Sequence, residues 1–129
     1  MSREYIKGEF EETRSYSRAV RVKGGTTVYL AGVVGRDAQG RDLPGDFPGQ
    51  ARATFDRLRD AIELVGGTLD NIVTMTVFIT DSRYGDEFVK LRSEYFQLGH
   101  YPASALITIS GLGHPGLLIE IQAIASLDN

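Results

Sequence analysis

The spacing of apolar residues changes several times along the chain, between steps of two and steps of three or four. Alternation is typical of a strand with one buried face, whereas three- and four-residue steps are typical of an amphipathic helix. Alternation predicts strands over residues 17–22 and 27–33, with the turn-forming pair Gly24-Gly25 between them. We therefore expect these two segments to form a β-hairpin.

The first helical pattern follows a loop that contains proline and glycine. Its apolar residues recur at three- and four-residue steps, at Phe55, Leu58, Ile62 and Val65. Asp46 precedes the pattern and is suited to cap the first turn of the helix. Gly66-Gly67 predicts the end of the helix, because glycine adopts the left-handed conformation of a C-cap.

The remaining chain adds three strands and a second helix. Residues 72–79 are rich in β-branched side chains and predict a strand. Helical spacing over residues 84–98 predicts the second helix, and alternation over 104–109 and 117–125 predicts the last two strands. The order is ββαβαββ, which indicates an α+β fold with a mixed sheet and both helices on one face. We treat residues 1–129 as one domain.

Two of the predicted strands are apolar on both faces. In residues 72–79, Val73, Met75 and Val77 share one face, while Ile72 and Phe78 lie on the other. Residues 117–125 show the same property. Two helices can cover only one face of such a sheet, so we expect the other face to pack against copies of the same chain.

Composition and charge narrow the classes of partner. The chain has 42% hydrophobic and 24% charged residues, as is usual for a globular protein. Its 14 Lys and Arg against 17 Asp and Glu give a net charge of −3, which does not favour nucleic acid or an anionic membrane. The arginines of the first helix alternate with acidic residues and so indicate a solvated surface.

Other residue types limit the chemistry. Cysteine is absent, which excludes disulfides, thiolate metal sites and cysteine nucleophiles. His100 and His114 are the two histidines, too few for a histidine-rich metal site. The first twelve residues lack the apolar run of a signal peptide, so we expect a cytoplasmic protein.

Several short motifs stand out along nearly the whole chain. They are Tyr16-Ser17, Leu30-Ala31-Gly32, Val77-Phe78-Ile79 followed by Asp81, Pro102-Ala103, and the closing segment Ile119-Glu120-Ile121-Gln122-Ala123-Ile124-Ala125. Together these motifs resemble those of the Rid/YjgF family of imine and enamine deaminases. The closing segment is the most specific of these motifs.

The resemblance implies a chorismate-mutase-like fold, a homotrimer with clefts between subunits, and no cofactor or metal. Family members hydrolyse small imino acids and their enamine tautomers to keto acids and ammonia. The family's glutamate, matched by Glu120, positions water, and an arginine after the Pro-Ala pair holds the substrate carboxylate. Ser104 stands at that arginine position, so the bidentate grip on a carboxylate is missing there.

Four residues are candidates for the site on their own chemistry. Alternation places Glu120 on a strand face, where a carboxylate needs a partner, water or solvent; it either acts on substrate or is structural. If the last two strands pair, Ser104 points to the same side as Glu120. Tyr16 either hydrogen-bonds the substrate or packs as an aromatic, and Gly32 either offers a backbone N–H or bends the strand.

A substrate carboxylate would require another cation in place of the missing arginine. Arg14, Arg18 and Arg92 are the candidates, because they flank elements that meet at the family's cleft, although for each one alone a solvated surface arginine is the favoured interpretation. His114 lies in the turn before the last strand and either titrates near the cleft or only shapes the turn.

Three functions remain open from the sequence. The first is a Rid-like hydrolase of a small imine or enamine acid, with Glu120 as the catalytic residue and a substrate that differs from that of the arginine-bearing branch. The second is a trimer that binds a small metabolite without turnover. The third is an RNA-acting homologue, since ribonuclease activity is attributed to some family members.

Overall fold

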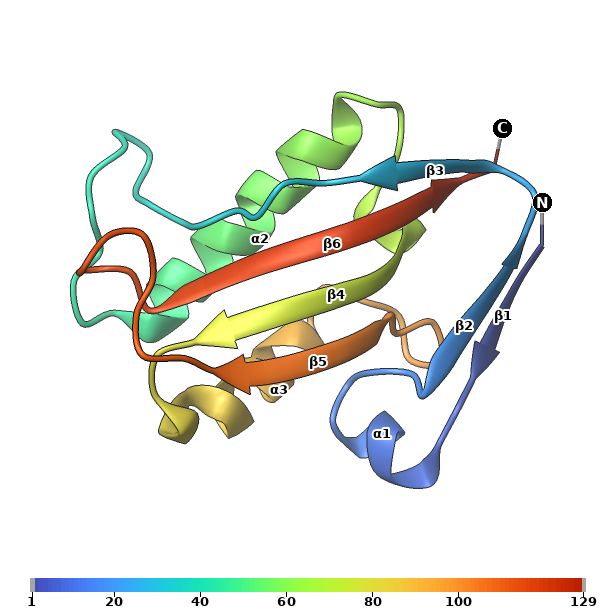
Figure 1. Cartoon of the computed structure of the whole chain (residues 1–129), viewed down its shortest axis with the longest axis horizontal. Helices are drawn as coiled ribbons and strands as arrows, with labels where there is room; N and C mark the ends of the chain where they lie inside the picture. Colours follow the sequence, from blue (N-terminus) through green and yellow to red (C-terminus); the bar gives the residue numbers. More distant parts are fainter. Residues whose placement is uncertain (1, 129) are drawn as a thin grey trace.

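The computed structural model describes residues 2–128 and shows an α+β fold with two separate sheets (Figure 1). The larger sheet has the strand order β3-β6-β4-β5. Its strands are β3 (Thr26–Tyr29), β4 (Ile72–Ile79), β5 (Ala103–Thr108) and β6 (Ile119–Leu127). Because β4 is parallel to β5 and antiparallel to β6, the predicted mixed sheet is confirmed.

The second sheet is an N-terminal ribbon of β1 (Ser2–Ile6) and β2 (Ala19–Lys23), joined through the short helix α1 (Glu9–Thr13). The prediction that residues 17–22 and 27–33 form a hairpin is wrong, because β2 pairs with β1 and β3 pairs with β6. Gly24 and Gly25 both have positive φ angles, 74° and 81°, and turn the chain from one sheet into the other. Strand β1 was not predicted, because its charged residues obscure the alternation.

Helices α2 (Phe47–Glu63) and α3 (Gly85–Arg92) both lie behind the larger sheet in Figure 1, as predicted. Asp46 caps α2 by accepting a hydrogen bond from the Gly49 backbone N–H at 2.9 Å. Helix α3 is shorter than the predicted span of 84–98, because the chain leaves the helix in a turn at residues 93–95. The 3₁₀ helices Leu69–Asn71 and Ser82–Tyr84 lead into β4 and α3. Within residues 2–128, none of the helices is both long and apolar enough to cross a bilayer.

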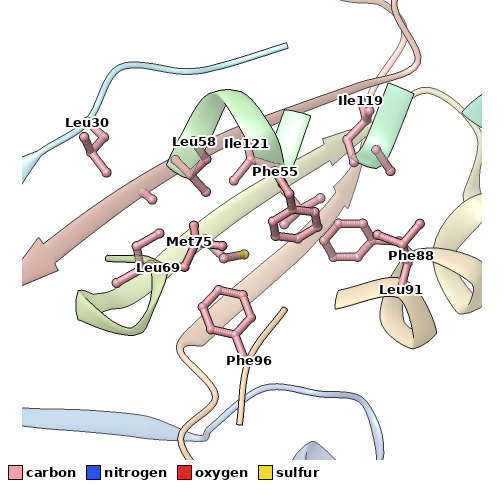
Figure 2. Close-up of a cluster of buried hydrophobic side chains, with 14 of the residues drawn as sticks. Leu30, Phe55, Leu58, Leu69, Met75, Phe88, Leu91, Phe96, Ile119 and Ile121 are labelled. Atoms are coloured by element: carbon pink, nitrogen blue, oxygen red, sulfur yellow. The ribbon is translucent and has the colours of Figure 1, made fainter. Parts of the chain in front are cut away.

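The hydrophobic core lies between these two helices and the sheet (Figure 2). Phe55 of α2 is at its centre, with its ring centroid 5.9 Å from that of Phe88 and 4.3 Å from that of Tyr95. Leu58 and Ile62 are buried as the helical spacing predicted, together with Met75, Val77, Ile79, Ile119 and Ile121 of the sheet. Val65 is 45% exposed, because α2 ends before it.

The opposite side of the larger sheet, which we call the open face, carries the alternate side chains of all four strands. They are Tyr29, Thr74, Thr76, Phe78, Ala105, Ile107, Glu120, Gln122 and Ile124. All of these are half-buried or exposed, and both α2 and α3 lie on the other side of the sheet. Phe78 and Ile124 confirm the second apolar face that the sequence indicated. Ile72, which was expected on this face, is buried in the core instead, because the pairing of β4 with β6 shifts between Ile72 and Thr74.

Candidate functional site

A pocket of about 430 Å³ opens where the segment between α1 and β2 meets α3 and β5. Its lining residues are Arg14, Tyr16, Val89, Arg92, Ser104, Ala105 and Leu106. The volume lies in the range of small-molecule sites, which span about 300–1,000 Å³. Four residues that the sequence singled out therefore meet in one place: Arg14, Tyr16, Arg92 and Ser104.

Arg92, the last residue of α3, forms the base of this pocket and is only 1% exposed. Its Nη1 donates to Ser104 Oγ at 2.6 Å, its Nε to Ser15 Oγ at 3.1 Å, and its Nη2 to the Arg14 carbonyl oxygen at 3.1 Å. Its guanidinium carbon lies 5.0 Å from the Phe88 ring centroid and 5.8 Å from that of Tyr16. These contacts hold the guanidinium in one orientation.

The Arg92 cation is buried without a counterion. Among residues 2–128, no carboxylate oxygen lies within 4.0 Å of its nitrogens. Burial lowers the pKa of Arg92 to about 10, so the group is still protonated at neutral pH. A guanidinium carries five N–H groups, and the three bonds above leave one N–H on each terminal nitrogen. Such a group is suited to bind an anion, because a buried charge is costly unless it is paired.

Ser15 supports Arg92 and was missed by the sequence analysis. It is buried, and its hydroxyl donates to the Val89 carbonyl oxygen at 2.7 Å while it accepts the bond from Arg92 Nε. Its φ angle of 59° lies in the left-handed region, which serine rarely adopts. A serine gives no sequence signal for that conformation, so only the structure identifies it.

Ser104 and Glu120 lie on opposite faces of the larger sheet, and the prediction that they share a side is wrong. Strands β5 and β6 do not pair with each other, because β4 lies between them. Ser104 is in register with the core residue Met75, whereas Glu120 is in register with Phe78 of the open face. Ser104 therefore faces α3 and the pocket, and Glu120 belongs to the open face.

Glu120 and Gly32 form a second group on the open face. A Cβ atom at position 32 would overlap Glu120 Oε2, so the carboxylate lies directly against the glycine backbone. Val33, the next residue, forms an antiparallel bridge with Ile121, which keeps this loop beside β6. The glycine is thus required for close approach to Glu120, and both residues stay candidates for one site.

The remaining candidates lie elsewhere. His114 Nδ1 is 3.6 Å from Asp42 Oδ2 in a solvent-exposed loop and does not line the pocket. Arg18 is paired with Glu11 at 3.0 Å outside the pocket. In the part of the chain that the structure describes, no group of three or more histidine and acidic residues could hold a metal ion.

Comparisons with known proteins agree with the fold and the motifs. Residues 7–127 match the family model described as endoribonuclease L-PSP. The RutC family protein YjgH of Escherichia coli is 31% identical over 113 residues, covering 87% of this chain and 82% of that protein.

Two solved structures extend the comparison. RidA of the Antarctic bacterium Psychrobacter is 30% identical with a TM-score of 0.73, covering 88% of this chain and 89% of that one. YyfB of Yersinia pestis, described as a Rid family protein of unknown function, is 24% identical with a TM-score of 0.88, covering 98% and 100%. Its likeness concerns the fold alone. With the match of the family model over most of its length, the chain belongs to the Rid/YjgF family.

Proposed function

We propose that the protein is a Rid-like hydrolase that binds a small imine or enamine acid in the pocket beside Arg92. The buried, unpaired guanidinium of Arg92 is the observation that carries this proposal. The substrate carboxylate accepts the two N–H groups that the protein leaves available on the terminal nitrogens. Tyr16 and the apolar side chains of Val89 and Leu106 enclose the rest of the molecule.

The position of Arg92 explains how the pocket retains a cation although position 104 is a serine. The Ser104 hydroxyl accepts a hydrogen bond from Arg92 Nη1, so the guanidinium of α3 lies where β5 presents its serine. In this proposal the positive charge that the family's arginine supplies from β5 is supplied here by Arg92 of α3. Because the guanidinium reaches the pocket from α3 and not from β5, it would hold the substrate carboxylate from another direction. This supports a substrate that differs from that of the arginine-bearing branch.

Hydrolysis then requires Glu120 to come from a second copy of the chain, because Glu120 and the pocket lie on opposite faces of one sheet. The Glu120 carboxylate takes a proton from water as the oxygen attacks the C=N carbon. That proton passes to the nitrogen and gives a tetrahedral intermediate with OH and NH2 on one carbon. Glu120 then moves the hydroxyl proton to the NH2 group, the C–N bond breaks as the C=O bond forms, and ammonia and a carbonyl compound leave. One water is consumed for each imine.

A second candidate is binding without turnover. It is favoured by the same separation, since the lining residues of the pocket come from one chain whereas Glu120 lies on the other face of the sheet. The RNA-acting alternative has less support, because Arg52 is paired with Glu94 and Arg59 with Asp56 on the first long helix.

The test of binding uses a pocket variant that is designed to leave the fold intact. In Ser104→Asp a carboxylate occupies the place of the hydroxyl that already contacts Arg92, so it neutralises the cation from within the protein. We expect wild-type protein to bind a stable 2-oxo acid in calorimetry, and Ser104→Asp to bind it at least tenfold more weakly with no loss of thermal stability. Equal affinities would disprove the role of Arg92.

The test of turnover measures ammonia released from imino acids generated in situ by an amino acid oxidase. Glu120→Gln should lose the rate and keep the affinity for the 2-oxo acid, because it changes proton transfer and not the pocket. If wild-type protein binds the acid but releases ammonia no faster than buffer for every substrate, the binding candidate replaces the hydrolase.

A further inference from the structure

We propose that the pocket selects small dicarboxylates, with Arg92 binding one carboxylate and Arg14 the other. This inference rests on the proposed function and names the class of acid that the site prefers. It starts from the lining of the pocket, which contains two arginines and no acidic residue.

The backbone of Arg14 is held against the Arg92 side chain. The Arg14 carbonyl oxygen accepts a hydrogen bond from Arg92 Nη2, and Ser15 next to it contacts Arg92 Nε. The Arg14 backbone is therefore fixed beside the Arg92 guanidinium, and both residues line the pocket. Arg14 is at its edge, with its side chain 32% exposed, whereas Arg92 is at its base.

The charges of the two arginines act on each other. Burial is the main cause that lowers the pKa of Arg92, and the positive charge of Arg14 lowers it further. A monocarboxylate neutralises Arg92 and leaves the positive charge of Arg14 at the edge. A dicarboxylate neutralises both, so it relieves the repulsion as well as the cost of the buried charge.

Arg14 has a partner that a ligand can replace. Its Nη1 lies 2.9 Å from Asp86 Oδ1, but the Asp86 side chain is 94% exposed. An ion pair in that setting contributes little, because water solvates the carboxylate equally well. Asp86 therefore competes only weakly with a ligand carboxylate, and it lies outside the lining of the pocket.

Calorimetry with 2-oxobutanoate and 2-oxoglutarate tests this selectivity at low ionic strength. We expect wild-type protein to bind 2-oxoglutarate at least tenfold more tightly. Arg14→Gln should remove that difference by weakening the dicarboxylate alone. Arg21→Gln is the matched control, because Arg21 is an exposed arginine paired with Glu4 and does not line the pocket. It should keep the tenfold preference.

Removing the Asp86 carboxylate should change the affinity for 2-oxoglutarate in the opposite direction to Arg14→Gln. Asp86→Asn frees Arg14 and should strengthen 2-oxoglutarate binding by about two- to fivefold, the range that loss of an exposed ion pair allows, with little effect on 2-oxobutanoate. Glu87→Gln makes the same change in net charge at the next position of α3, and we expect no selective effect from it. A general electrostatic effect would instead make the two variants behave alike and would overturn the inference.

The outcomes separate the two proposals. If 2-oxobutanoate binds in a manner that Ser104→Asp abolishes, but 2-oxoglutarate binds no more tightly, only the dicarboxylate inference fails. An equal loss of both acids in Arg14→Gln also contradicts it. If neither acid binds wild-type protein, the proposed function fails with it.

Discussion

At the residue scale, the orientation of Arg92 depends on a serine in a rare backbone conformation. Ser15 has a φ of 59°, and its hydroxyl connects Arg92 Nε to the Val89 carbonyl oxygen. Strained residues of this kind occur often at functional sites, where the surrounding structure keeps them in place. We interpret Ser15 as a residue that positions the Arg92 guanidinium. The contribution of its hydroxyl and that of its backbone conformation can be tested with separate variants.

Ser15→Gly removes the hydroxyl but suits the positive φ, whereas Ser15→Ala removes the hydroxyl and keeps the strain. If the hydroxyl orients Arg92, both variants should bind a 2-oxo acid about tenfold more weakly, as the loss of one hydrogen bond to a charged group predicts. Thermal unfolding should show Ser15→Gly to be the more stable of the two. Unchanged affinity in Ser15→Gly would show that Ser15 serves the backbone only.

The sequence contained a partial signal for Arg92. Its position four residues after Phe88 places it on the buried face of α3, and Tyr95 follows on the same side. Helical spacing alone could not separate Arg92 from Arg14 and Arg18, because the burial of a charged side chain depends on hydroxyl and carbonyl groups brought in from distant segments. Ser15 and Ser104 supply those groups.

At the element scale, the helices were predicted more accurately than the pairing of the strands. The start and end of α2 follow from local signals, the Asp46 cap and the left-handed Gly66 with a φ of 85°. The partner of β3 is instead β6, at the other end of the chain. Alternation of apolar residues identifies a strand but carries no information about which strand it pairs with. The expected hairpin of residues 17–22 with 27–33 was therefore wrong.

The N-terminal ribbon is joined to the rest of the molecule by Arg3. Its Nη1 donates to the Asp70 carbonyl oxygen at 2.7 Å and its Nη2 to that of Ser126 at 3.0 Å. Because the pocket residues Arg14 and Tyr16 lie shortly before β2 in the chain, the position of this ribbon affects the site.

Arg3→Met should loosen the ribbon while the larger sheet stays folded. A loss of about 2 kcal/mol for these charge-assisted bonds corresponds to roughly 30-fold faster amide exchange in β1 and β2. Hydrogen exchange measures this directly, with protection in β4 as the internal reference. Arg21→Met is the control, because Arg21 lies on the same ribbon and is paired there with Glu4 in an exposed ion pair. Equal rates of amide exchange in β1 and β2 of the two variants would show that Arg3 does not hold the ribbon in place.

At the scale of the whole molecule, the open face connects self-association with chemistry. It carries exposed or half-buried apolar side chains such as Tyr29 and Ile107, and it also carries Glu120. The residues that line the pocket beside Arg92, in contrast, all come from one chain. Binding and turnover should therefore respond differently when the association of copies is prevented.

Gln122→Arg tests this difference, because Gln122 is in register with Thr76 near the middle of the open face. A buried arginine without a partner should prevent packing through that face, so the mass in solution should fall to that of one chain. Gln97→Arg makes the same substitution in an exposed turn away from the sheet and should leave the assembly unchanged. Light scattering coupled to size exclusion measures both.

The monomeric variant then distinguishes where each part of the site comes from. Since the pocket lies within one chain, Gln122→Arg should bind a 2-oxo acid with wild-type affinity. Since Glu120 acts from a second copy, the same variant should release ammonia no faster than Glu120→Gln does. A monomer that keeps full turnover would show that a single chain completes the reaction, and a wild-type protein that is already monomeric would remove the open face as an interface.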